Sequence, residues 1–213
     1  MKALITGFDP FGGESINPAF EAIKKMKDKI GTCEVVKLEI PTVFNRSLEV
    51  LEAAIEQEKP DFVICVGQAG GRFSMSLEKV GINLNEARIP DNDGQQPLNE
   101  KIKDDGETAY FSSLPNKAIA KAMNDHFIPA EVSYTAGTYV CNHVLYGLMY
   151  LIDKKYPHLR GGFIHVPFLP EQVMDKRNAP YMELSRITKG LELAIEVTAS
   201  NEVDIEYVSG ETH

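Results

Sequence analysis

Short apolar runs alternate with longer amphipathic segments along most of this chain. The short runs are typical of buried β-strands. The longer segments repeat apolar residues every three or four positions, as Leu48, Leu51 and Ile55 do, which predicts helices with one buried face. We therefore expect strands at residues 2–6, 34–40, 62–66, 130–135 and 162–166, and helices at residues 18–29, 47–57, 115–126, 140–155 and 181–199.

The order of these elements predicts the fold class. Strands separated by helices imply parallel pairing with right-handed crossovers, and hence an α/β fold. Asn17 and Pro18 support the first helix, since they supply an N-cap and a proline at the first helical position. A length of 213 residues favours one domain over two. We expect a single domain, residues 1–213, folded as a three-layer α/β/α sandwich around a mostly parallel, mixed sheet.

The alternation is interrupted between residues 67 and 106. Residues 67–71 form a glycine-rich loop, and residues 74–89 alternate loosely, which predicts a hairpin. Residues 90–106 are polar and rich in Asp, Asn, Gln and Gly. That segment is too long for an ordinary connection, so we expect it to be a lid, an interface or a substrate-binding loop.

Composition excludes several classes of partner. The chain has 22 basic and 31 acidic residues, a net charge of −9, which argues against nucleic acid or an anionic membrane as the main partner. No apolar run approaches the roughly 18 residues of a membrane span. The first residues resemble a strand more than a signal peptide. Three cysteines are too few for a disulfide framework, so we expect the reducing cytoplasm.

The sequence offers no motif for a metal or a cofactor. The glycine-rich loops at residues 7–13 and 67–71 lack the P-loop Lys-Ser/Thr and the G-x-G-x-x-G order, respectively. No Cys and His residues have convincing zinc spacing. The residues therefore indicate neither a nucleotide-binding loop nor a zinc site.

Cys141 is the leading candidate for chemistry. It follows an apolar, β-rich stretch and falls in the first turn of the helix expected at residues 140–155. The positive end of that helix is expected to lower the thiol pKa and favour the nucleophilic thiolate. The alternative is a small buried hydrophobic residue. That alternative is preferred for Cys33 and Cys65, which lie in apolar runs.

Two further residues complete a possible catalytic set. His165 ends an expected strand and is either a catalytic base or a satisfied core histidine. Glu78, in a glycine-bounded loop region, either orients an imidazole or is a surface charge paired with a lysine. His143 is only two residues from Cys141, so on a helix it points to a different side. The remaining histidines are expected to be solvated: His126, His158 and His213.

The fold class also predicts where a site would lie. In open α/β sheets, sites form beyond the carboxyl ends of the strands. The segments at such ends are residues 7–13, 67–71, 136–141 and 165–168. Phe8 and Phe11 flank the first of these turns, and loop aromatics in that position are typical walls of an apolar pocket.

These segments together resemble the pyroglutamyl peptidase I family, also called pyrrolidone carboxyl peptidases, which are intracellular cysteine peptidases. The matching segments follow the family's order, and the overall length also matches. They are residues 7–13 with Asn17-Pro18, then 66–72, 82–91, 133–143 and 165–172. The resemblance covers essentially the whole chain.

The resemblance implies an enzyme that removes an amino-terminal L-pyroglutamyl residue from peptides, without a cofactor and commonly as a homotetramer. It makes Cys141 the nucleophile, His165 the base and Glu78 the residue that orients the base. The positions that match the family's substrate pocket or lie close to it are Phe8, Phe11, Asn17, Gln68, Arg88, Tyr139 and Val140.

Two positions depart from the family's pattern, and two other functions remain open. Gly81 and Tyr139 stand where alanine and phenylalanine are expected in close relatives, and a Tyr139 hydroxyl must find a partner or water. A non-catalytic small-molecule-binding domain would leave Cys141 unreactive. A different thiol hydrolase would act on another lactam or acyl group.

Overall fold

The computed structural model of the chain describes residues 1–206, and its centre is a seven-stranded sheet in the order β2-β3-β1-β4-β9-β5-β8. The strands are β1 (Lys2–Phe8), β2 (Lys29–Ile30), β3 (Cys33–Ile40), β4 (Phe62–Gln68), β5 (Met75–Glu78), β8 (Ala130–Ser133) and β9 (Arg160–Val166). Two neighbouring pairs, β2–β3 and β5–β9, are antiparallel, and the other pairs are parallel. The predicted mixed, mostly parallel sheet is confirmed.

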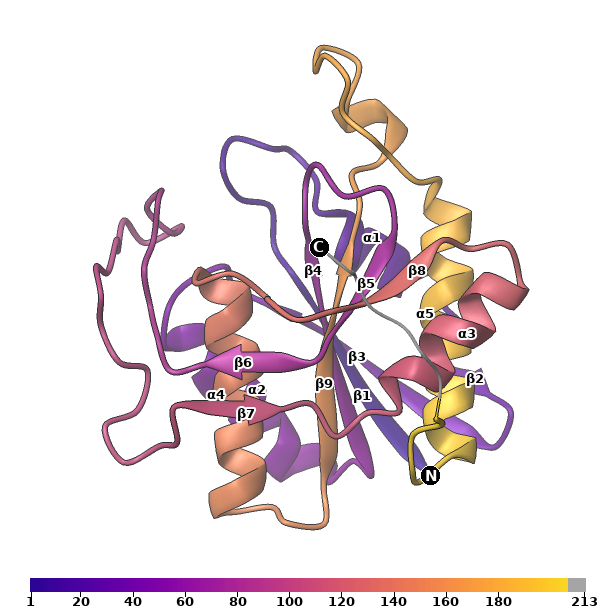
Figure 1. Cartoon of the computed structure of the whole chain (residues 1–213), viewed down its shortest axis with the longest axis horizontal. Coiled ribbons are helices and arrows are strands. Elements are labelled where there is room, and N and C mark those ends of the chain that lie inside the picture. The colour runs from indigo at the N-terminus through magenta and orange to yellow at the C-terminus, as the bar shows by residue number, and fades with distance from the viewer. Residues whose placement is uncertain (207–213) are drawn as a thin grey trace.

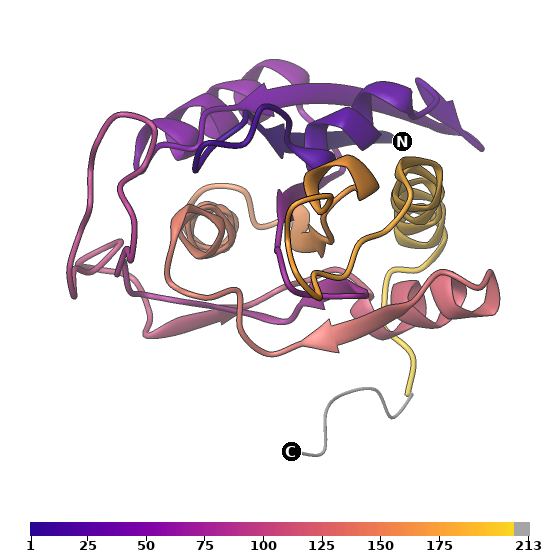
Figure 2. The same cartoon turned by 90° about the horizontal axis from the view of Figure 1, so that it is seen from above.

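Helices cover both faces of this sheet (Figures 1 and 2). On one face lie α2 (Arg46–Glu58) and α4 (Val140–Lys154), and on the other lie α1 (Pro18–Lys25), α3 (Asn116–Asp125) and α5 (Leu184–Ser200). Each face has its own buried apolar cluster, and burial of these side chains is the main force that holds the layers together. The predicted three-layer α/β/α sandwich is confirmed. No helix within residues 1–206 is long and apolar enough to cross a membrane.

Helix α1 begins as predicted but ends four residues early. The Asn17 side chain accepts a hydrogen bond from the Ala19 N–H at 3.1 Å, which caps the first turn. The helix ends at Lys25, because Met26 turns extended and its carbonyl accepts a bond from Lys37 Nζ of β3 at 2.5 Å. Contacts with β3 therefore override the helical pattern beyond Lys25.

The predicted hairpin at residues 74–89 is wrong. Strand β5 joins the main sheet, while β6 (Val80–Ile82) leaves it and pairs with β7 (Ala109–Phe111) in a separate two-stranded sheet. Asn142 of α4 holds β6 through two bonds of 2.9 Å, to the N–H and the carbonyl of Ile82. A Cβ on Gly81 would lie 2.9 Å from the Tyr146 nitrogen, so a glycine permits this close approach of β6 to α4.

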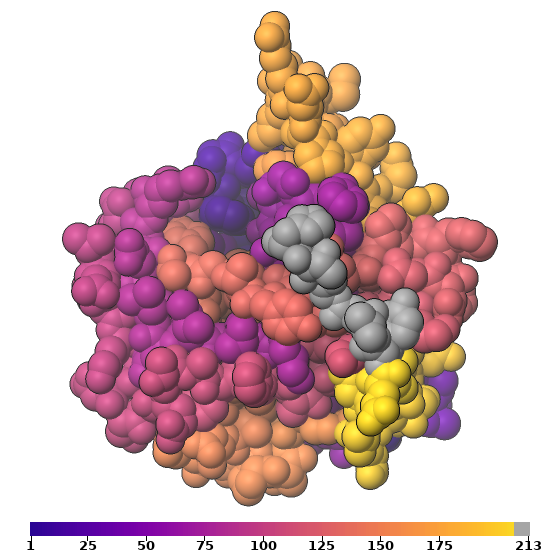
Figure 3. All heavy atoms as spheres, viewed as in Figure 1, coloured from indigo at the N-terminus to yellow at the C-terminus, as the bar shows by residue number. Residues whose placement is uncertain are grey.

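The polar segment 90–106 is fastened to the loops that follow β1 and β3. An isolated bridge between Asn85 and Glu100 closes its base. Asp91 is buried and accepts from the Phe44 N–H at 2.9 Å, and the Asn92 side chain donates to the Pro10 carbonyl at 2.9 Å. These bonds hold the segment against two loops at the carboxyl edge of the sheet. At the same edge, the segment between β9 and α5 stands out from the surface (Figure 3).

Candidate active site

The strand-end segments expected to form a site do meet at one edge of the sheet. The loop after β1 reaches the start of α4, where the Phe11 and Tyr139 rings lie 6.1 Å apart. The end of β4 meets the segment after β9, where Gln172 Nε2 donates to Gln68 Oε1 at 2.9 Å. Side chains from distant parts of the sequence therefore share one region, as the fold class predicted.

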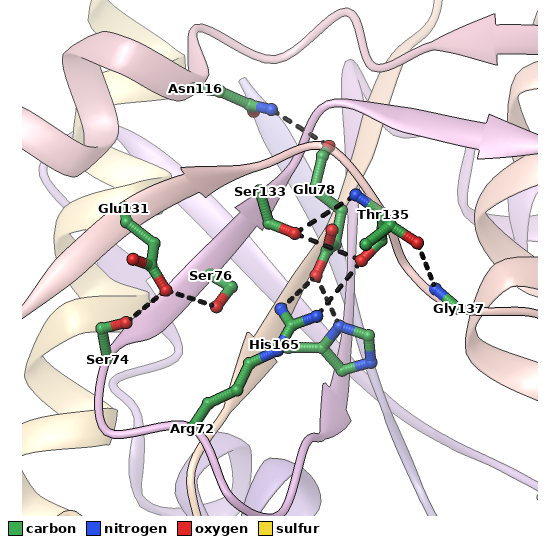
Figure 4. Close-up of polar contacts among 10 residues, drawn as sticks. All are labelled: Arg72, Ser74, Ser76, Glu78, Asn116, Glu131, Ser133, Thr135, Gly137 and His165. Carbon is green, nitrogen blue, oxygen red and sulfur yellow. Dashed lines mark hydrogen bonds and ion pairs between the residues drawn. The ribbon is translucent and has the colours of Figure 1, made fainter. Parts of the chain in front are cut away.

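Glu78 and His165 form a buried pair in this region (Figure 4). Glu78 Oε1 lies 2.7 Å from His165 Nδ1, and the Glu78 side chain is 0% exposed. The expected loop location of Glu78 is wrong, since it ends β5, and so is the alternative of a surface charge. An Nδ1–H that donates to Glu78 leaves His165 Nε2 free to accept a proton.

The surroundings of Glu78 keep it ionised. Burial by itself raises a carboxyl pKa, but the hydrogen bond and charge of His165, the Ser133 hydroxyl and the charge of Arg72 together outweigh it, so the pKa of Glu78 lies below its ordinary value. A carboxylate in this state can orient His165 and stabilise its charged form.

Cys141 lies in the first turn of α4, and its thiol packs against the end of β4. A Cβ on Gly67 would lie 2.9 Å from Cys141 Sγ. Gly67 is the partner of His165 in the parallel pairing of β4 with β9. Paired residues on neighbouring strands face the same side of a sheet. The Cys141 thiol, which lies against Gly67, is therefore on the same face as the His165 side chain and one strand away from it. The fold thus brings the three predicted catalytic residues together.

The expected low pKa of the Cys141 thiol is wrong for the free site. Burial raises the pKa of Cys141 to about 12, the negative charge of Glu78 adds to that effect, and the charge of Arg72 opposes it. The thiol is therefore protonated near neutral pH and needs a proton acceptor when it attacks.

The other cysteines, and His143, are buried residues outside the proposed catalytic set, as expected. Cys33 and Cys65 are buried, and burial raises the pKa of Cys65 to about 12. His143 is buried and accepts from the Asn45 N–H at 3.1 Å, away from Cys141, and burial lowers its pKa to about 4.

His126 and His158 are exposed, as expected, and His213 lies outside the described residues. Within residues 1–206, no group of three or more His, Cys, Asp or Glu side chains is arranged to hold a metal ion.

Aromatic rings gather beside the thiol. Phe8 is buried with its ring 6.3 Å from that of Phe163, and Tyr139 lies between Phe11 and Phe44, with the Phe44 ring edge-on at 5.5 Å. Phe44 was missed in the sequence. It follows the strand at residues 34–40 as Phe8 and Phe11 follow the first strand, so the same argument could have found it.

The polar residues expected at the pocket differ in their placement. Asn17 uses its side chain within the protein, because it donates to the Asp9 carbonyl at 3.0 Å and accepts from the Ala19 N–H. These bonds fix the loop that carries the aromatic walls. Gln68 is half-buried and held by Gln172. Val140 is buried at the start of α4, whereas Arg88 is exposed.

The Tyr139 hydroxyl has found a partner. It donates to the Pro90 carbonyl at 3.1 Å, and burial raises its pKa to about 12, so it remains a donor at neutral pH. Tyr139→Phe is expected to lower the free energy of unfolding by about 0.5–1.5 kcal/mol, the usual net value of one hydrogen bond. Urea unfolding of both proteins measures this difference, and equal unfolding free energies would show that the bond contributes nothing.

The missing side chain of Gly67 is needed for the thiol to fit. In Gly67→Ala the new Cβ would lie 2.8 Å from Phe163 Cζ and 2.9 Å from Cys141 Sγ. We expect the variant to lose about 1–3 kcal/mol of stability, because the core there is already full. Displacement of the thiol should slow its alkylation by iodoacetamide. An alkylation rate and a melting temperature equal to those of the wild type would contradict this packing.

Arg72 is the residue at this site that sequence reasoning left without a role. Its Nη1 lies 2.7 Å from Glu78 Oε1, and its Nη2 donates to the Thr135 carbonyl at 3.1 Å (Figure 4). The available signal was an arginine directly after Gly70 and Gly71, where the chain leaves β4. A lone arginine in a turn is ordinarily a solvated charge, so only the folded chain reveals its contacts.

The fold and the site together define a class of protein. An α/β/α sandwich with a buried carboxylate–imidazole pair and a cysteine thiol at the carboxyl edge of its sheet is the architecture of a cysteine hydrolase. A family model described as Pyroglutamyl peptidase matches residues 1–201. The chain belongs to the pyroglutamyl peptidase family.

Individual relatives are similar to this chain over almost their whole length. The chain is 57% identical to a pyrrolidone-carboxylate peptidase of Lactobacillus johnsonii, over 100% of both chains. It is 58% identical to a pyrrolidone-carboxylate peptidase of Clostridium perfringens, over 99% of both. Among solved structures, pyroglutamyl peptidase I of Bacillus amyloliquefaciens is similar with a TM-score of 0.93 and 52% identity, covering 96% of this chain and 99% of that one.

Proposed function

We propose that this chain is a cysteine peptidase that removes an amino-terminal L-pyroglutamyl residue from peptides. The observation that carries the proposal is the buried Glu78–His165 pair, 2.7 Å apart, with the Cys141 thiol packed over the strand position next to His165. Membership of the pyroglutamyl peptidase family supplies the substrate class.

The proposed reaction begins with a proton transfer. Because burial holds the pKa of Cys141 at about 12, the thiol gives its proton to His165 Nε2 as the sulfur attacks the substrate carbonyl. Glu78 holds the other ring nitrogen and stabilises the imidazolium. His165 then returns the proton to the leaving amine, and water hydrolyses the resulting thioester.

The start of α4 can stabilise the oxyanion. The first N–H groups of a helix have no partner within the helix, and no side chain caps α4 at Tyr139. The N–H of Cys141 is therefore the donor we assign to the oxyanion of the tetrahedral intermediate.

The neighbouring residues suit a cyclised, uncharged amino terminus. An ordinary aminopeptidase holds a free ammonium with carboxylates, whereas the pyroglutamyl lactam needs apolar walls and a few amide groups. We assign the walls to Phe8, Phe11, Tyr139 and Val140, and the lactam contact to Gln68. Asn17 acts by fixing the loop that carries the first two walls. Arg88 is exposed and is assigned to the peptide that follows the lactam.

We further propose that the enzyme works in the cytoplasm as a homotetramer. The three free thiols suit a reducing compartment. The segment 90–106 is a candidate contact between subunits, since it carries Leu98, which is 74% exposed. Light scattering coupled to gel filtration measures the assembly, and a monomer at every concentration would rule out the tetramer.

A substrate panel tests the activity. The reduced protein is assayed for release of 7-amino-4-methylcoumarin from its L-pyroglutamyl, L-prolyl and L-alanyl amides. We expect turnover of the pyroglutamyl amide and little of the other two, since both carry a charged amine that the apolar walls would desolvate. Turnover of another amide alone would indicate a different thiol hydrolase. No turnover by the folded protein would favour a binding domain.

A further inference from the structure

Arg72 bridges two of the elements that carry the proposed catalytic residues. Its guanidinium contacts the same carboxylate oxygen, Glu78 Oε1, that His165 uses, and the charged pair is 2.7 Å apart. Its second nitrogen donates to the Thr135 carbonyl at 3.1 Å, six residues before Cys141 on the segment that leads into α4. One planar side chain thus links β5 with the junction of β8 and α4.

The Thr135 carbonyl belongs to the loop between β8 and α4, which Thr138 joins to Glu86 by two further bonds, from the Glu86 N–H at 3.0 Å and to the Glu86 carbonyl at 2.7 Å. The Ser133 hydroxyl also donates to this carbonyl at 3.2 Å, and the Gly137 N–H donates to the Thr135 hydroxyl at 3.2 Å. The bonds of Ser133 and Gly137 are local, because each joins residues two positions apart. The bond from Arg72 joins the loop to the catalytic carboxylate, so it can transmit the position of Glu78 to the start of α4.

The charge of Arg72 acts on both ends of the proposed catalytic set. It contributes to the low pKa of Glu78, and it opposes the rise in the pKa of the Cys141 thiol. His165 on β9 and Cys141 on α4 also interact with the charge of Glu78, and the Ser133 hydroxyl on β8 contributes to its low pKa. Glu131 on β8 is held by the hydroxyls of Ser74 and Ser76, along the sheet from the pair (Figure 4).

Arg72 is also open to solvent on its far side. Its side chain is 29% exposed, and it borders a cavity of about 380 Å³ whose walls are residues 71–73 and 131–135. The carboxylate that it contacts is fully buried, so loss of Arg72 would leave a buried charge with one partner fewer. The two contacts of Arg72 are with the buried Glu78 carboxylate and with the Thr135 carbonyl, in the loop that leads to Cys141.

We propose that Arg72 is a positioning residue of this active site, which fixes Glu78 in its ionised, His165-facing state and holds the start of α4 in register with it. The inference rests on the proposed function for its effect on turnover, but its effect on the thiol does not depend on any substrate. It assigns a role to a residue outside the Glu78, His165 and Cys141 set.

The test compares Arg72→Gln, Arg72→Lys and a control, Arg186→Gln, which removes an exposed arginine of α5 on the opposite side of the sheet. Two readouts are taken from about pH 5 to pH 9: kcat/KM for the L-pyroglutamyl amide, and the rate at which iodoacetamide alkylates Cys141. Circular dichroism establishes that each variant is folded.

We expect Arg72→Gln to reduce kcat/KM at neutral pH about tenfold or more. Loss of the positive charge raises the pKa of Glu78, so the acidic limb of the profile moves to higher pH. Alkylation of Cys141 should slow, because its reactive thiolate form loses the stabilising positive charge of Arg72. Arg186→Gln should leave both readouts unchanged.

The Arg72→Lys variant separates the effect of the positive charge from the effect of the two contacts that Arg72 makes with Glu78 and Thr135. Its ammonium can restore the acidic limb but cannot reproduce the two-armed contact with Glu78 and Thr135, so kcat/KM should stay below that of the wild type. If Arg72→Gln does not fold, a lysine variant with wild-type kcat/KM overturns the bridging role. A folded glutamine variant with the wild-type acidic limb and alkylation rate overturns the inference, whereas an inactive wild type with slowed alkylation in Arg72→Gln overturns only the proposed function.

Discussion

Replacing Cys141 with serine is expected to lower kcat/KM for an L-pyroglutamyl amide by at least about 1,000-fold. A serine hydroxyl has a far higher pKa than a thiol and is a poorer nucleophile without a base matched to it. The loss should fall on kcat, since the aromatic walls that bind the lactam are unchanged. The measurement is release of 7-amino-4-methylcoumarin by the two proteins under reducing conditions.

Cys33→Ser is the matched control for this change. Cys33 is buried in β3 on the face of the sheet opposite the site, and its sulfur already lies 3.5 Å from the Glu34 carbonyl, to which a hydroxyl can donate. The control should therefore fold and keep its activity. Full activity in Cys141→Ser would exclude thiolate attack by this residue.

His165→Gln is expected to cost about 100- to 10,000-fold in kcat/KM, because it removes the proton acceptor of a thiol that burial keeps protonated. It should also change the pH dependence of stability. The pKa of Glu78 is lower in the folded protein than in the unfolded chain, so its ionised form stabilises the fold above the ordinary carboxyl pKa, and this stabilisation is lost as the pH falls. Without His165 the loss on acidification should be smaller.

Kinetics and urea unfolding between neutral and acidic pH measure both effects. His158→Gln is the control, because His158 is exposed near the opposite end of β9. A His165→Gln variant that retains more than about a tenth of the wild-type kcat/KM would remove His165 as the base.

The framework of the fold was predictable because its strands are short, continuous and apolar. Strand β4 and helix α2 lie within two residues of the ranges expected from sequence. Strand β5 could not be predicted from the sequence, because it has only four residues and two of them, Ser76 and Glu78, are polar yet buried. Its neighbours, β8 and β9, come much later in the chain, so no local pattern could place it.

The location of the candidate site was predictable from the sequence, whereas the protonation state of its thiol was not. The rule that sites form beyond strand ends led to Cys141 and His165, and the fold brings both to one edge. The state of the thiol depends on burial and on the charge of Glu78, which only the folded chain defines. Arg72 was missed for the same reason, since its two partners lie in different parts of the sequence.

The most direct test of the account uses an L-pyroglutamyl chloromethyl ketone, in which a reactive carbon stands next to the carbonyl that the nucleophile attacks. The protein is treated with this reagent or with its L-alanyl counterpart, and the modified cysteine is identified by peptide mapping. We expect the pyroglutamyl reagent alone to label Cys141 and abolish turnover at the same rate. Labelling of Cys33 or Cys65 instead, or equal reaction with both reagents, would contradict a pyroglutamyl pocket that presents its substrate to Cys141.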